Sequence, residues 1–158
     1  MTMPSAQTDL LKGLSGDEAD RLLAIGTPMA VPAGGVLFRL GEPAASVFQV
    51  VRGRVTLTLP MQVRGAEEDV LIEERLPGET LGWSGLVPPH RFTLKATAAV
   101  DSELTAFSRA ALLDHFSAHP SVAYVVTRNV AAVIGHRLQV FQTMWLREMQ
   151  RVVELRYT

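Results

Sequence analysis

The chain has 158 residues, of which 47% are hydrophobic and 20% charged, and its formal net charge is −1. This composition is ordinary for one folded globular domain and excludes a wholly disordered chain. The near-balanced charge also argues against non-specific binding to nucleic acid, which needs a strongly basic face.

The sequence contains neither a long apolar run nor a cysteine. A membrane-spanning helix needs about 20 predominantly apolar residues, so we expect no membrane contact. The absence of cysteine excludes disulfides, iron–sulfur clusters and thiol redox chemistry. Residues 1–14 lack a basic stretch followed by an apolar one, so we expect no secretory signal and a cytoplasmic protein.

Short helices are predicted over 8–26, where Ser15 and Glu18 have the spacing of a capping box. Over 29–107 the pattern changes to a period of two, with apolar and polar side chains alternating in 55–59 and 92–98. Glycine-rich turns separate the runs at short intervals, which is typical of an all-β sandwich or roll.

Two smaller predictions concern turns and charges in this β region. Arg52-Gly53 is expected to turn the strand 47–51 back as a hairpin. The acidic residues at 67–69 and 73–74 are interpreted as solvated positions of a hairpin rather than as acid–base pairs.

Residues 108–156 are predicted to form two helices, the first capped by Ser108 and the second by Ser121. The second runs to about Leu155, which corresponds to a length of about 50 Å. A compact chain of this size has a radius of gyration of about 15 Å, so the last helix should cross or overhang the roll.

The last helix has two apolar stripes. They consist of Ile134, Leu138, Phe141, Trp145 and Val152, and of Val130, Val133, Val140 and Met144. Two stripes imply two neighbours, and a second copy of the helix is the simplest second neighbour, so we expect a homodimer. The alternative is one wide buried face in a monomer.

From residue 128 on, the chain contains five arginines and two glutamates, which indicates a solvated basic face or a contact for an acidic partner.

The segment 77–93, PGETLGWSGLVPPHRFT, contains the candidate binding site. Its glycine-punctuated part, 82–85, can open one helical turn whose exposed N–H groups attract an anion. Arg91 follows, and backbone donors with one arginine are the groups that hold a phosphate. Each feature also has an alternative interpretation. The glycine segment can be an ordinary turn, Arg91 can form a surface ion pair, and Trp83 can serve only in packing.

Taken in order, these pieces resemble the cyclic nucleotide-binding domains of the catabolite activator protein (Crp/Fnr) superfamily, in a stand-alone bacterial form. The resemblance covers about 11–152 and is carried by PAGGVLFRLGEP at 32–43, VFQVVRGRVTL at 47–57, LPGETLG at 76–82, Arg91, and RLQ at 137–139. It implies a mainly-β jelly roll of about eight strands, with N-terminal helices and a long C-terminal helix. It also implies that 82–91 is the phosphate-binding cassette.

The chain departs from the family pattern within this cassette. The family has glutamate at the position of Trp83, and that glutamate accepts a hydrogen bond from the ribose 2′-hydroxyl, whereas tryptophan has no acceptor. Phe92 and Thr93 follow Arg91, where the family has serine or threonine and then alanine. The resemblance places Phe141 and Gln142 where the activator protein meets the base. The predicted ligand-binding residues are Gly82, Trp83, Ser84, Gly85, Leu86, Arg91, Phe92, Thr93, Phe141 and Gln142.

The sequence therefore predicts a single domain, 1–158, that senses a ligand and is not an enzyme. We expect no cofactor. We also expect no metal, because only His90 lies in the β region and because His115 and His119, although spaced i, i+4, have no evident third ligand. A cyclic nucleotide, cAMP or cGMP, is the possible ligand, with weak or absent binding of cAMP. We expect no DNA binding, because the sequence stops where the family's helix-turn-helix begins. The alternatives are a degenerate domain that serves in dimerisation or docking, and a transcription regulator whose DNA-binding part lies outside this sequence.

Overall fold

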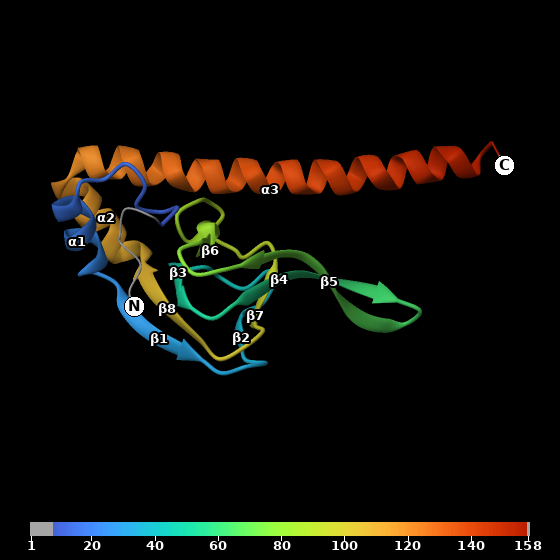
Figure 1. Ribbon diagram of the computed structural model, residues 1–158, viewed down its shortest axis with the longest axis horizontal. Coiled ribbons are helices and arrows are strands. Elements are labelled where there is room, and N and C mark those ends of the chain that lie inside the picture. The colour runs from blue at the N-terminus through green and yellow to red at the C-terminus, as the bar shows by residue number, and fades with distance from the viewer. Residues whose placement is uncertain (1–7, 158) are drawn as a thin grey trace.

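A computed structural model describes residues 8–157 and contains two four-stranded antiparallel sheets with helices at both ends (Figure 1). The sheet orders are β1-β8-β3-β6 and β2-β7-β4-β5. The strands are β1 (Thr27–Val31), β2 (Val36–Phe38), β3 (Ser46–Arg52), β4 (Val55–Val63), β5 (Ala66–Arg75), β6 (Thr80–Leu81), β7 (Lys95–Ala98) and β8 (Ser102–Ser108). This arrangement confirms the predicted mainly-β roll.

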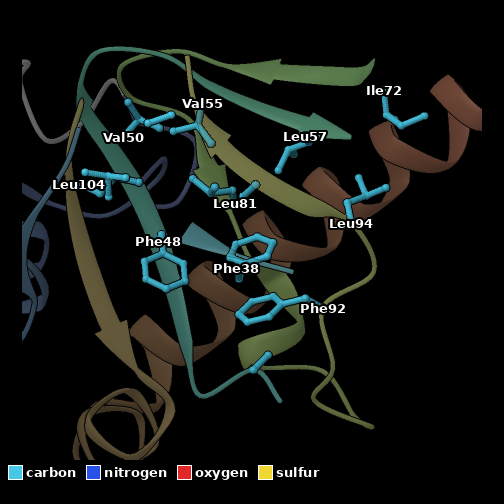
Figure 2. Packing of buried hydrophobic residues seen from close by; sticks show 14 residues of the cluster. Phe38, Phe48, Val50, Val55, Leu57, Ile72, Leu81, Phe92, Leu94 and Leu104 are labelled. Carbon is cyan, nitrogen blue, oxygen red and sulfur yellow. The ribbon is translucent and has the colours of Figure 1, made fainter. Parts of the chain in front are cut away.

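The alternation of side chains directs one face of each sheet into a shared core (Figure 2). Phe92, Leu94, Ala96 and Ala98 are all buried, as the period of two predicts, although only the last two lie within β7. Burial of apolar area at about 25 cal/mol per Å² is the main force that holds the sheets together.

Three helices cover the outside of the roll: α1 (Gly16–Leu23), α2 (Arg109–Ala118) and α3 (Pro120–Leu155). The capping box of α1 is confirmed, since the Ser15 hydroxyl accepts from the Glu18 N–H at 3.2 Å and the Glu18 carboxylate accepts from the Ser15 N–H at 2.9 Å. Ser108 caps α2 as predicted. The prediction for Ser121 is wrong, because the N-cap of α3 is His119, two residues earlier, and the helix begins at Pro120, whose fixed φ suits the first helical position.

The turn at Arg52-Gly53 does not form the predicted hairpin. Strand β3 pairs with β6 and β8, whereas β4 pairs with β5 and β7. The chain crosses here from one sheet to the other, so that Val50 and Val55 meet in the core between them. Periodicity predicts that a strand has a buried face but does not specify which strand lies beside it.

Helix α3 has 36 residues, which corresponds to a length of about 54 Å, and its C-terminal part extends past the roll (Figure 1). Its roll-facing stripe is buried at Val130 and Val133, whereas Leu138 and Trp145 of the other stripe are 58% and 61% exposed. From Gln142 to Tyr157 every residue is exposed. No helix within residues 8–157 is long and apolar enough to cross a membrane.

Candidate functional site

The turn after β6 is built on two glycines. Gly82 has φ +76°, the left-handed region that favours glycine, and it precedes one turn of 3₁₀ helix, η2 (Trp83–Gly85). A Cβ on Gly85 would lie 2.5 Å from the carbonyl oxygen of Ser46, so a larger residue would push the turn off β3. The predicted single helical turn is therefore present and is held tightly against the sheet.

Five of the predicted residues line one small cavity of about 10 Å³ at this turn. They are Gly82, Trp83, Ser84, Phe92 and Thr93. The remaining lining residues are Phe38, Leu57, Leu94 and Arg137. A cavity of this volume holds about one water molecule, whereas sites for small molecules measure about 300–1,000 Å³.

Aromatic side chains fill the roll next to this cavity (Figure 2). The rings of Phe38 and Phe92 stack with their centroids 3.7 Å apart and their planes 7° from parallel, and Phe48 lies 6.0 Å from Phe38. The interior of the roll is thus closed in this conformation, and a ligand could enter only if the stack opened.

Arg91 does not line the cavity. It is exposed, its guanidinium donates to the carbonyl oxygen of Gly41 at 2.9 Å, and its backbone pairs with Pro43. The neighbouring His90 ring approaches the carbonyl oxygen of Ser84 at 2.9 Å through Nδ1, which ties the end of the loop to η2. Arg91 follows the glycine turn in the same loop, but its side chain lies outside the roll.

The other predicted residues lie around the turn at different depths. Leu86 ends η2 and packs into the core beneath the helices. Phe141 is half-buried against the roll core, whereas Gln142 is exposed. The structure therefore brings Phe141 close to the roll and leaves Gln142 on its surface.

Sequence reasoning assigned no separate role to Arg137 and treated it as part of a basic helix face, which is wrong. Its side chain is 8% exposed, and its Nε lies 3.0 Å from Oε1 of Glu73 on β5. Burial lowers the pKa of the Arg137 guanidinium, and the charge of Glu73 acts in the opposite direction. The signal was present in the sequence, because Arg137 falls between Val133 and Val140 in the apolar stripe that packs on the roll.

Glu73 also departs from its prediction as a solvated hairpin residue. Its side chain is 9% exposed, and it forms ion pairs with both Arg137 and Arg75, which is 6% exposed. By contrast, 67–69 are exposed as expected, and Asp69 pairs with Lys95 at 2.7 Å. Within 8–157, no group of three or more His, Asp or Glu side chains is placed to hold a metal.

A larger cavity of about 670 Å³ lies away from this turn, where strands β1, β3 and β8 meet α1. Its lining includes Leu23, Pro28, Gln49, Val51 and Thr105. None of the residues that line this cavity belongs to the predicted ligand-binding set. The larger cavity and the sequence motif therefore indicate different locations for a ligand site. The smaller cavity combines the glycine turn with a buried cation from α3, Arg137.

Comparison with known proteins agrees with this fold. Residues 28–119, more than half of the chain, match the model of a family described as the cyclic nucleotide-binding domain. In solved structures, the catabolite activator protein of Thermus thermophilus superposes with a TM-score of 0.74 and 25% sequence identity, over 90% of this chain and 63% of that one.

Two curated proteins are also similar in sequence. Glutaminase 1 of Bradyrhizobium diazoefficiens is 30% identical over 141 residues, which are 87% of this chain and 21% of the glutaminase. The Pycsar effector protein XpPycTIR of Xanthomonas perforans is 27% identical over 120 residues, which are 76% of this chain and 36% of the effector. The chain thus spans only about a fifth to about a third of the length of these relatives.

Proposed function

The chain belongs to the cyclic nucleotide-binding domain family, and we propose that it is a regulatory domain that senses a ligand and has no catalytic activity of its own. The observation that carries the proposal is the position of Arg137. This residue belongs to α3, yet it lines the same cavity as Gly82 and Ser84 of the glycine turn. A ligand at the turn would contact the helix directly, so its binding would change how α3 packs on the roll.

The ligand that fits this site best carries a phosphate group. The N–H groups of Gly85, Leu86 and Val87 already donate within the turn, so its candidate backbone donors are those at its start. Arg137 offers a buried positive charge, and Arg91 lies at the outer end of the same loop. The cavity must widen before a nucleotide can enter, and Trp83 has no acceptor for a ribose hydroxyl. We therefore expect cAMP and cGMP to bind weakly or not at all.

We propose in addition that two copies associate through α3 in the cytoplasm. The exposed residues Leu138, Trp145 and Val152 recur at every seventh position, the repeat of a two-stranded coiled coil. A second copy of α3 packed along this stripe would cover it. Movement of α3 in one copy would then be transmitted to the other copy through the contact between the two helices.

A second candidate function is a dimerisation or docking module that binds no nucleotide. The stacked rings of Phe38 and Phe92 and the cavity of about 10 Å³ favour it. In that case the roll would be a permanently closed support for α3, and α3 would be the functional surface.

A binding screen separates the two functions. The purified chain is heated with cyclic mononucleotides and cyclic dinucleotides, and each hit is titrated by calorimetry. A ligand at 100 times its dissociation constant adds about 2.7 kcal/mol of stability, which shifts the melting temperature by several degrees. A shift that is lost in Arg137→Gln supports the sensor, and the absence of any shift supports the docking module.

A further inference from the structure

A single buried carboxylate joins two buried arginines from different parts of the fold. Oε1 of Glu73 lies 3.0 Å from Nε of Arg137 on α3, and Oε2 of Glu73 contacts Nη2 of Arg75 on β5. The nearest further anion is Glu79, which is 39% exposed and lies 3.4 Å from Nη1 of Arg75. Two buried cations thus share one buried anion, and of the two only Arg75 has a second carboxylate partner, Glu79.

The contact between Glu73 and Arg137 is an ion pair without a well-aligned hydrogen bond. Although the two atoms are 3.0 Å apart, neither Nε of Arg137 nor Oε1 of Glu73 has a hydrogen-bond partner among the described residues. A buried charge with an imperfect partner is held at a free-energy cost. An anion that offered Arg137 better-aligned acceptors would therefore compete with Glu73.

This ion pair lies where α3 leaves the roll. Arg137 is the last buried residue of the helix. Beyond Arg137, Val140 and Phe141 are half-buried, and the remaining residues of the helix, 138–139 and 142–155, are exposed. The ion pair is consequently the last fully buried contact between the roll and the part of α3 that extends past it.

We propose that Glu73 is a positioning residue that holds Arg137, and with it the segment of α3 from Arg137 to Phe141, against the roll until an anionic ligand replaces it. The displacement step rests on the proposed function, because it requires a ligand at the glycine turn. The holding role concerns the ligand-free protein and stands by itself. The two parts are therefore tested separately.

The first experiment compares Glu73→Gln with the wild type in the absence of ligand. The amide keeps the shape of the side chain and removes its charge, so we expect amide hydrogen exchange over 137–141 of α3 to quicken about tenfold. Asp69→Asn is the matched control. It also removes a carboxylate from β5, but the ion-pair partner of Asp69 is Lys95 on β7 and not a residue of α3. Equal exchange in Glu73→Gln and the wild type would overturn the holding role.

Fluorescence gives an independent readout of the same movement. The chain has two tryptophans, so Trp145→Phe leaves Trp83 as the remaining emitter. Trp83 packs against the core cluster that includes Val126 and Val130 of α3. We expect Glu73→Gln to shift the Trp83 emission to the red and Asp69→Asn to leave it unchanged. If Glu73→Gln fails to fold, Arg137→Gln removes the same ion pair from the helix side and takes its place in both measurements.

The second experiment titrates cyclic AMP into three proteins by calorimetry. Glu73→Gln should raise the affinity about tenfold, because it removes the competing anion, whereas Arg137→Gln should lower it by a similar factor. A merely structural role of Glu73 would lower the affinity in both variants and would overturn the displacement step. If none of the proteins binds cyclic AMP, displacement by this ligand is refuted, and the exchange data still decide the holding role.

Discussion

Truncation of Phe92 to alanine should lower the stability of the chain and raise its affinity for a ligand. Phe92 is 7% exposed and stacks on Phe38 at a centroid distance of 3.7 Å. Removal of a buried phenylalanine ring costs about 3–5 kcal/mol. A domain has about 5–15 kcal/mol of stability in total, so we expect Phe92→Ala to fold but to be much less stable.

The same ring obstructs the ligand site. Because the cavity measures about 10 Å³, a nucleotide must separate the stack, which sacrifices packing of the same order as the truncation. In Phe92→Ala the packing is already lost before the ligand arrives. If the truncation removes about 1.4 kcal/mol from the free-energy cost of separating the rings, the affinity for the ligand rises tenfold.

The assay combines urea unfolding, which gives the free energy of unfolding, with calorimetric titration of cyclic AMP. Leu104→Ala is the control, because Leu104 is 1% exposed in the same core but does not line the cavity at the glycine turn. It should cost about 2–5 kcal/mol of stability and leave the affinity unchanged. Unchanged affinity in Phe92→Ala, or an equal gain in Leu104→Ala, would refute the reasoning.

Three further changes test the site and the assembly. Arg91→Ala should lower the free energy of unfolding by about 1 kcal/mol or less, because the side chain is exposed and makes one hydrogen bond to a carbonyl. If Arg91 binds a ligand phosphate after a rearrangement, calorimetry will show a larger loss in binding than in stability. Trp83→Glu combined with Phe92→Ser should raise the affinity for cyclic AMP by about 1–3 kcal/mol, and submicromolar binding by the unmodified chain would contradict this interpretation of Trp83. Leu138→Asn should give monomers and lower the melting temperature only by the stability that association adds, because Leu138 is 58% exposed, whereas Phe141→Asn should also weaken packing on the roll. Light scattering at roughly tens of micromolar protein measures the oligomeric state of both variants and of the wild type, and a monomeric wild type would refute the dimer.

The sequence by itself determined the class of fold, because local rules govern it. Side chains alternate along a strand, so the period of two in 92–98 was enough to predict which of those residues are buried. The capping box at Ser15 and the cap at Ser108 depend on neighbours within three residues, and both are present as predicted. The turn at 82–85 is also local, since its glycines suit a backbone with positive φ and close contact with β3.

Only the tertiary structure decided the contacts between distant segments. The crossing at Arg52-Gly53 depends on the pairing of β3 with β8, whose paired residues are between 51 (Arg52 with Glu103) and 62 (Ser46 with Ser108) positions apart in the sequence. The ion pair of Glu73 with Arg137 joins β5 to α3, and no local pattern identifies which carboxylate a buried arginine will meet. Likewise, the sequence placed Arg91 in the loop after the glycine turn, but the direction of its side chain was fixed by the carbonyl of Gly41 on another segment. Local periodicity specifies which face of an element is buried, whereas the partner across the core depends on how all the elements pack together.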